Sequence, residues 1–164
     1  MLILYHGLTS VCSVKVRIGL AEIGLEYESH VLDLPKGDQH HPDYLKINPD
    51  AVVPTLVDDG LVLYESSLIL EYLDREYNDG NLMPAGKAAE AGARLWLLRC
   101  LSVHDAVNSL SFSTAHRDRT LASKTAEEIA AMLANMPDPV KRMKRKDLLD
   151  NGLASVFVQQ ALLN

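Results

Sequence analysis

Residues 2–33 decide the fold, and they read LILYHGLTSVCSVKVRIGLAEIGLEYESHVLD. The run from Leu2 to Tyr5 is short and almost wholly apolar, which predicts a strand buried on both faces. The segment after Thr9-Ser10 is apolar over much of a helical circumference, and Gly24 is well placed to end that helix in a left-handed cap. Residues 27–33 are half-polar and alternating, which predicts a second strand. Strand, helix and strand together form a βαβ unit.

The following segments extend this unit into a small α/β domain. Residues 35–49 form a polar loop that holds a short helix. Two apolar runs, 54–57 and 61–64, flank Asp58-Asp59-Gly60, which is a strong hairpin signal. A helix is predicted at 66–77. The order β-α-β-loop-β-β-α predicts an α/β thioredoxin-like fold for this part of the chain.

The second half of the sequence carries helical patterns and no strand signals. Glycine and proline are frequent just before it, and this indicates a linker. We expect a thioredoxin-like domain at 1–78, a linker at 79–87 and an all-α helical domain at 88–164. The expected helices of the last part are 88–112, 125–134, 140–149 and 153–163. The final helix is strongly apolar and lacks a capping signal, so we expect the helical domain to be truncated and the chain to be a fragment.

Composition excludes several classes of function. The 164 residues hold 16 Lys+Arg and 22 Asp+Glu, a net charge of −6, which argues against a dedicated nucleic-acid binder. The basic run 141–146 is therefore expected to be a solvated helix. No apolar run approaches the roughly 20 residues of a membrane span, and the N-terminus does not resemble a signal peptide, so we expect a cytoplasmic protein without membrane contact. Cys12 and Cys100 are too few for a disulfide framework, and no histidine spacing suggests a metal site.

One candidate for chemistry is Thr9 to Ser13, where the first helix begins. Unpaired backbone N–H groups and the helix dipole stabilise an anion there, including a thiolate. The simpler alternative is that Ser10 is an N-cap and Cys12 a small buried hydrophobe. Dithiol exchange of the glutaredoxin kind is disfavoured, because residues 12–15 lack the second cysteine of a C-x-x-C pair.

Two further candidates lie at strand ends. If the Val53–Pro54 peptide bond is cis, Val53 turns its backbone N–H and C=O outward, where they can pair with an extended ligand. Glu65-Ser66 stands between a strand and a helix, and its carboxylate and hydroxyl could hold the ammonium and carboxylate of one ligand. The alternative for this junction is a plain N-cap by Ser66 or Ser67. All three candidates lie at strand ends of one α/β domain, where ligands tend to bind.

The residues Ser10 to Ile18, Val53 to Leu56 and Glu65-Ser66 resemble the cytosolic glutathione transferase superfamily. The resemblance spans the chain and implies that glutathione is the co-substrate, with no metal. It implies attack of glutathione thiolate on a hydrophobic electrophile, with isomerisation or reductive cleavage as variants. It also implies a homodimer. A non-catalytic glutathione-binding or protein-interaction module, and a thiol transferase that works through Cys12, remain as alternatives.

The resemblance also implies roles for the catalytic candidates. Ser10 matches the serine of zeta- and theta-like classes, whose hydroxyl donates a hydrogen bond to the glutathione sulfur. Cys12 matches both a cysteine of zeta-like enzymes and the reactive cysteine of bacterial beta-class enzymes. We favour Ser10 as the sulfur ligand, with Cys12 as its neighbour or an alternative nucleophile.

The remaining roles concern the binding of glutathione. The backbone of Val53, positioned by a cis Pro54, would pair with the cysteinyl part of glutathione. Glu65 and Ser66 would hold its γ-glutamyl ammonium and carboxylate. Many relatives carry Lys or Gln where this chain has Val52, so Gln39 or His40 is expected to reach the glycyl carboxylate instead.

Overall fold

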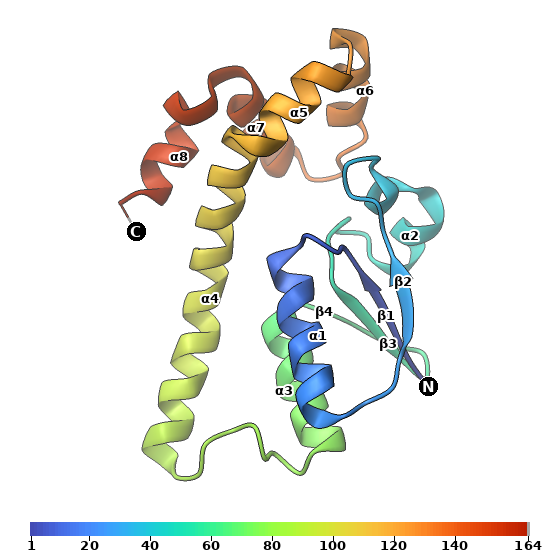
Figure 1. The fold of residues 1–164 in the computed structure, drawn as a ribbon, viewed down its shortest axis with the longest axis vertical. Helices are drawn as coiled ribbons and strands as arrows, with labels where there is room; N and C mark the ends of the chain where they lie inside the picture. The colour runs from blue at the N-terminus through green and yellow to red at the C-terminus, as the bar shows by residue number, and fades with distance from the viewer. Residues whose placement is uncertain (164) are drawn as a thin grey trace. The chain divides into compact units, whose positions relative to one another are not determined.

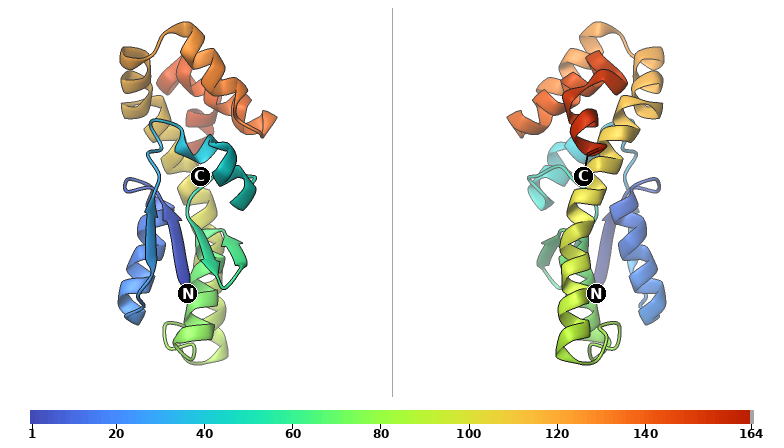
Figure 2. Two further views of the ribbon diagram at one scale, coloured as in Figure 1. Left: turned by 90° about the vertical axis from the view of Figure 1, so that its right-hand side faces the viewer. Right: turned by 90° about the vertical axis from the view of Figure 1, so that its left-hand side faces the viewer.

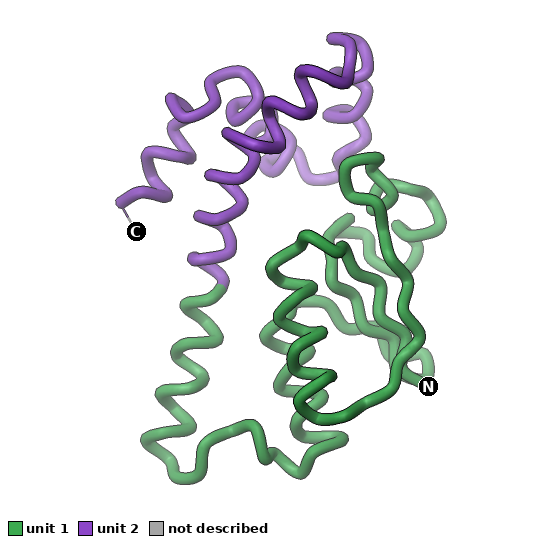
Figure 3. Tube along the Cα trace, viewed as in Figure 1, with its two compact units in different colours: residues 1–100 green, residues 101–164 purple. Residues whose placement is uncertain are grey.

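The computed structural model describes residues 1–163 and divides the chain into two compact units, Met1–Cys100 and Leu101–Asn164 (Figure 3). The irregular segment between residues 78 and 86 lies inside the first unit. The domain boundaries expected from the sequence, at 78 and 88, stay a prediction. No helix among the described residues combines the length and the apolarity needed to cross a membrane.

The first unit is built on a four-stranded mixed sheet with the strand order β2-β1-β3-β4 (Figure 1). β1 pairs in parallel with β2, whereas β1–β3 and β3–β4 are antiparallel. The bounds of the strands are β1 Leu2–His6, β2 Glu28–Val31, β3 Thr55–Asp58 and β4 Leu61–Tyr64. This arrangement confirms the predicted thioredoxin-like fold.

Two helices, α1 Val11–Ile23 and α3 Ser66–Tyr77, pack on one face of this sheet (Figure 1, Figure 2). The core between them consists of apolar side chains, namely Leu2, Leu4, Val16, Leu20, Leu56, Ile69 and Leu73. The two helices approach closely at Gly19, where a Cβ atom would lie 2.2 Å from Leu70 Cδ2. A short 3-10 helix η1 Asp38–His40 and a helix α2 Pro42–Ile47 complete the loop that follows β2.

The predicted hairpin between β3 and β4 turns at Asp59-Gly60. Both residues have positive φ, 43° at Asp59 and 92° at Gly60, as the two central positions of a type I′ turn require. Glycine adopts this conformation without steric cost and aspartate tolerates it. The Asp-Gly dipeptide thus fixes the register in which Thr55 pairs with Tyr64.

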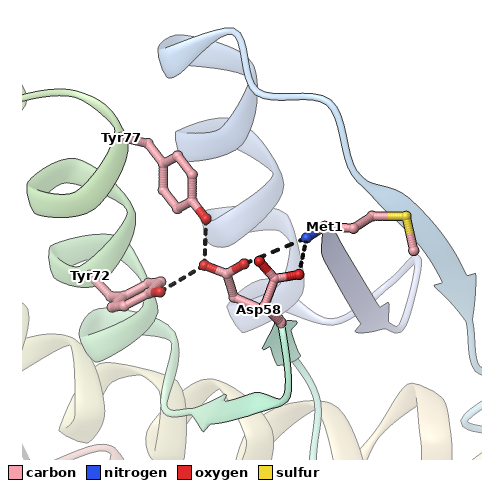
Figure 4. Close-up of polar contacts among 5 residues, drawn as sticks. Met1, Asp58, Tyr72 and Tyr77 are labelled. Atoms are coloured by element: carbon pink, nitrogen blue, oxygen red, sulfur yellow. Dashed lines mark hydrogen bonds and ion pairs between the residues drawn. The ribbon is translucent and has the colours of Figure 1, made fainter.

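Asp58, at the end of β3, collects polar groups from distant parts of the first unit (Figure 4). Its carboxylate accepts a hydrogen bond of 2.7 Å from the hydroxyl of Tyr72 and a second one from the hydroxyl of Tyr77. The ammonium of Met1 lies 3.9 Å from the same carboxylate and bonds Asp59 at 2.5 Å. The Asp58 side chain is only 8% exposed, so its carboxylate is largely shielded from solvent. These contacts connect β3, α3 and the N-terminus.

The second unit is all-helical, which confirms that part of the expected fold. The long helix α4 Lys87–Ser113 contributes residues to both units. The helices that follow are α5 Ala115–Ser123, α6 Ala126–Ala134, α7 Pro139–Asn151, the 3-10 turn η2 Gly152–Ala154 and α8 Val156–Ala161. Their buried apolar side chains include Leu148, Leu149 and Val158.

Two helical segments differ from the expectation. The sequence pattern does not predict helix α5, because the polar run from His116 to Arg119 hides any apolar period. The single helix expected at 153–163 is a 3-10 turn followed by α8, because the Ser155 hydroxyl accepts a hydrogen bond from the N–H of Phe157 and begins a new helix there.

Candidate functional site

The pairing register brings the predicted site segments to one end of the sheet. His30, Tyr5, Thr55 and Tyr64 are successive partners across the four strands. The chain leaves the sheet just beyond this row after β1, β2 and β4, and it enters the sheet there at β3. The predicted site segments therefore all begin or end at the same end of the sheet. They contain Ser10, Gln39-His40, Val53-Pro54 and Glu65-Ser66.

Ser10 is the N-cap of α1. Its Oγ accepts a hydrogen bond of 3.3 Å from the N–H of Ser13, and the Ser13 hydroxyl in turn accepts 3.2 Å from the N–H of Gly7. A serine hydroxyl can accept two hydrogen bonds and donate one. Capping therefore leaves the Ser10 proton free to be donated to a ligand, so the capping role and the predicted role as sulfur ligand are compatible.

Cys12 is half-buried in the first turn of α1, and the Ser66 hydroxyl hydrogen-bonds its sulfur. Burial raises the pKa of the Cys12 thiol, while Ser66 and the Lys15 ammonium act in the opposite direction. Burial dominates, so Cys12 is mainly a neutral thiol at pH 7. This protonation state favours Ser10 over Cys12 as the group that acts on a glutathione sulfur.

The Val53–Pro54 peptide bond is cis, and Val53 is half-buried. A buried polar network holds the preceding residue: the carbonyl of Val52 accepts hydrogen bonds from the Tyr44 hydroxyl at 2.5 Å and from Asn48 Nδ2 at 3.1 Å. Among residues 1–163, the hydrogen bonds of loops and turns do not use the N–H or C=O of Val53. These two groups are therefore available to an extended ligand.

Glu65, between β4 and α3, has an unusual backbone conformation. Its φ of 76° and ψ of 105° are rare for a residue with a side chain and cost about 1–3 kcal/mol. The exposed carboxylate makes no cap hydrogen bond to α3, whereas the Glu65 carbonyl accepts the first helical bond, from the N–H of Ile69 at 2.9 Å. The neighbouring Ser66 is only 2% exposed. The alternative of an N-cap by Ser66 or Ser67 is wrong, because both serines lie inside α3. There the Ser66 hydroxyl bonds the Cys12 sulfur and the Ser67 hydroxyl bonds the carbonyl of Leu97.

Gln39 and His40 lie in η1, in the loop that follows β2, and both are half-buried. The Oε1 atom of Gln39 is buried without a hydrogen-bond partner among the described residues. A buried amide oxygen of this kind is costly unless a ligand or water pairs with it. Gln39 therefore stays a candidate for the far end of a ligand, alongside His40.

No role is predicted for Lys15 from the sequence, and Ser67 is considered there only as a helix cap. The Lys15 ammonium donates a hydrogen bond of 2.8 Å to the Ser67 hydroxyl, which donates at 3.2 Å to the carbonyl of Leu97 on α4. Burial lowers the pKa of Lys15. The available signal was the spacing of Lys15 from Cys12, because residues three apart share a helix face.

The first unit thus presents an exposed carboxylate, a serine hydroxyl and backbone groups without a partner among the described residues at one end of a thioredoxin-like sheet. Comparison with known proteins identifies the family that this unit resembles. Residues 9–76 match the family described as glutathione S-transferase, N-terminal domain. The chain is thus similar to the cytosolic glutathione transferase superfamily, and residues 9–76 carry the likeness to its N-terminal domain.

Three relatives illustrate the range of the match. Glutathione S-transferase Z1 of Arabidopsis thaliana is 46% identical over 81 residues, 49% of this chain and 37% of that protein. A stringent starvation protein A homolog of Pasteurella multocida is 34% identical over 138 residues, 82% of this chain and 64% of that protein. The crystal structure of beta-etherase LigF from Sphingobium superposes with a TM-score of 0.79 at 27% identity, covering 99% of this chain and 68% of that one. The chain thus spans between about a third and two thirds of these relatives.

Proposed function

We propose that this chain is the glutathione-binding part of a glutathione transferase, in which Ser10 stabilises the glutathione thiolate for attack on a hydrophobic electrophile. The observation that carries the proposal is the convergence of Ser10, Val53 and Glu65 at one end of the sheet, where Glu65 has a strained backbone conformation and a carboxylate that does not cap α3. Strained backbone conformations cluster at ligand sites.

Each part of glutathione has a counterpart in the site. The carboxylate of Glu65 would bind the γ-glutamyl ammonium, and the start of α3 at Ser66 would bind the γ-glutamyl carboxylate with its N–H groups. The N–H and C=O of Val53 would pair with the cysteinyl residue as a neighbouring strand does. Gln39 would bond the glycyl end, either as acceptor or, with its amide turned over, as donor to the carboxylate.

The thiol of glutathione would then lie at the start of α1. The Ser10 hydroxyl would donate a hydrogen bond to its sulfur, and the helix N-terminus would add a favourable potential. Both favour the thiolate over the thiol and lower the pKa of the bound thiol. The thiolate then attacks the electrophile, and the sulfur–carbon bond forms as the leaving group departs.

The first test is a calorimetric titration with reduced glutathione. The unmodified chain is expected to bind, and Glu65→Ala is expected to abolish binding because it removes the carboxylate from the junction of β4 and α3. Glu22→Ala is the matched control, since this exposed glutamate lies on α1 away from that end of the sheet. Absence of binding to the unmodified chain, or equal binding by Glu65→Ala, would overturn the proposal.

The second test separates binding from activation. A hydrogen bond to a charged sulfur is worth about 1.5–3 kcal/mol, so Ser10→Ala is expected to lower kcat with a generic aryl halide about 10- to 100-fold. The affinity for glutathione should change far less, because the hydroxyl acts mainly on the thiolate. An equal loss in both quantities would assign Ser10 to binding alone.

A second candidate is a non-catalytic glutathione-binding or protein-interaction module. It is favoured by the match to the stringent starvation protein A homolog, whose name states no enzymatic activity. Glutathione binding without turnover of any generic electrophile would select this alternative.

We also propose that the protein is a cytoplasmic homodimer. The support is the resemblance to dimeric transferases, together with the exposed apolar side chains of α4, among them Leu95 at 47% and Leu98 at 64% exposure. A second copy of the chain would cover such side chains.

A further inference from the structure

The two cysteines of this chain lie far apart in the sequence, yet each belongs to a helix that contacts the start of α3. The Ser66 hydroxyl hydrogen-bonds the sulfur of Cys12. The next residue, Ser67, donates to the carbonyl of Leu97 at 3.2 Å, which places one turn of α4 against the same junction. Cys100 follows Leu97 by three residues and therefore shares its helix face.

Lys15 links the two cysteines. It lies three residues after Cys12 on α1, and its ammonium donates to Ser67 at 2.8 Å. The ammonium interacts electrostatically with both cysteines, and the two cysteines interact with each other. Cys12, Cys100 and Lys15 all belong to the first compact unit and are all half-buried, so each is partly open to solvent.

We propose that Cys12 and Cys100 form a redox-active dithiol that exchanges with glutathione disulfide and closes into an internal disulfide. The choice of Cys12 as the first cysteine to react rests on the proposed function, because that function places glutathione at the start of α1. The C-x-x-C pair that the sequence lacks is thereby replaced by a pair formed between α1 and α4.

The exchange proceeds in two balanced steps. The thiolate of Cys12 attacks one sulfur of glutathione disulfide, breaks the S–S bond, forms a mixed disulfide and releases one glutathione thiolate. The thiolate of Cys100 then attacks the Cys12 sulfur of the mixed disulfide, closes the Cys12–Cys100 bond and releases the second glutathione. Two protein thiols are oxidised and one glutathione disulfide is reduced to two glutathione molecules, which take up the two protons.

The surroundings of Cys12 set the pH range of the first step. Burial and the Glu65 carboxylate disfavour its thiolate, whereas the Ser66 hydroxyl and the Lys15 ammonium favour it, and Cys100 opposes it once that thiol is itself ionised. Because burial dominates, exchange is expected to be slow at pH 7 and to accelerate as the pH rises.

The test counts thiols after the full chain is treated with glutathione disulfide at about pH 8.5, near the pKa of an ordinary thiol. The reaction is quenched in acid, free thiols are alkylated under denaturing conditions, and the intact mass is measured. The expected product carries no alkyl group and no glutathionyl group, because both cysteines are joined to each other. Cys100→Ser is expected to stop at one glutathionyl group on Cys12. The same chain unfolded in urea is the control and is expected to accumulate glutathionyl groups, since unfolding separates the two cysteines.

Three results would overturn the proposal. The folded chain could keep a stable glutathionyl group on Cys12 while Cys100 stays alkylatable, it could carry glutathionyl groups on both cysteines, or both thiols could remain free. Hydroxyethyl disulfide, which lacks the peptide groups of glutathione, separates this inference from the proposed function. Formation of the Cys12–Cys100 disulfide with either reagent supports the dithiol, even where calorimetry finds no binding of reduced glutathione. Absence of this disulfide with both reagents refutes the dithiol, even where glutathione binds.

Discussion

Asp58→Asn is the substitution whose effect on stability is best defined by the structure. The Asp58 carboxylate accepts hydrogen bonds from Tyr72 and Tyr77 and attracts the ammonium of Met1 (Figure 4). A hydrogen bond to a charged group is worth about 1.5–3 kcal/mol. Asparagine keeps one acceptor oxygen but loses the charge. Tyr77 is 41% exposed, so solvent weakens the contribution of the hydrogen bond between its hydroxyl and Asp58. We expect the free energy of unfolding to fall by about 2–3 kcal/mol.

Urea denaturation at pH 7 measures this loss, and a thermal melt should show Tm lower by about 5–10 °C for a chain of this size. Tyr72→Phe and Tyr77→Phe, alone and combined with Asp58→Asn, form double-mutant cycles that isolate each hydroxyl–carboxylate pair. Two outcomes would refute this account of the cluster. One is a fall in the free energy of unfolding of less than about 0.5 kcal/mol on Asp58→Asn. The other is that Tyr72→Phe and Tyr77→Phe lower the free energy of unfolding as much in the Asp58→Asn variant as in the unmodified chain.

The pH dependence gives an independent check. The tyrosine hydroxyls hold the pKa of Asp58 below its usual range, so its contribution to stability is full above the unfolded pKa of about 4 and is lost as the pH falls through the folded pKa. Asp58 raises the pKa of Tyr72 and Tyr77 to about 12, so their contribution is full below about pH 10 and is lost as the pH rises toward 12. The difference in the free energy of unfolding between the unmodified chain and Asp58→Asn should therefore be constant near pH 7 and become smaller at both low and high pH.

Three further predictions concern other parts of the chain. In a Cys100→Ser background, iodoacetamide alkylates Cys12, and the rate should reach half its maximum at a higher pH than it does for an unburied thiol. Lys15→Met should raise this midpoint pH further. A midpoint at or below that of the unburied thiol contradicts the burial of Cys12. In sedimentation velocity, Leu98→Glu should convert the proposed dimer to a monomer. Leu121→Glu, at an exposed leucine of α5, is the control and should leave the dimer intact. A dimer that neither substitution affects would place the interface elsewhere. Thr125→Ala removes the capping box of α6 and should cost about 1 kcal/mol, visible as faster amide exchange in that helix; unchanged exchange would show that the cap is not needed.

The sequence predicts the first unit well because its signals are local. The alternation of strands, the Asp-Gly turn and the left-handed cap at Gly24 each specify backbone conformation within a few residues, and the structure confirms all three. The strand-end positions of Ser10, Val53 and Glu65 follow from the same order of elements. Their meeting at one end of the sheet follows from the registers of β1 with β3 and of β3 with β4, and the hairpin turn fixes only the second of these.

Features that depend on packing between distant helices could not be predicted. The proposed pairing of Cys100 with Cys12 has no local sign in the sequence, because it depends on the contact of α4 with the start of α3. The basic run 141–146 is expected from its charge to be a solvated helix, yet the Arg145 guanidinium stacks on the ring of Phe112 at 3.2 Å from its centroid. Burial there lowers the pKa of Arg145 to about 10. Charge patterns predict exposure only when nothing packs over the helix.

The left-handed backbone of Glu65 sets two selection pressures against each other. Glycine at this position would relieve the strain and stabilise the fold by about 1 kcal/mol, but it would delete the carboxylate. Under the proposed role of Glu65, a protein that keeps its ligand must carry this defect in local stability, while one that has lost the ligand can replace the residue by glycine or asparagine. The residue at this position in a relative then indicates whether that relative has kept the proposed ligand contact.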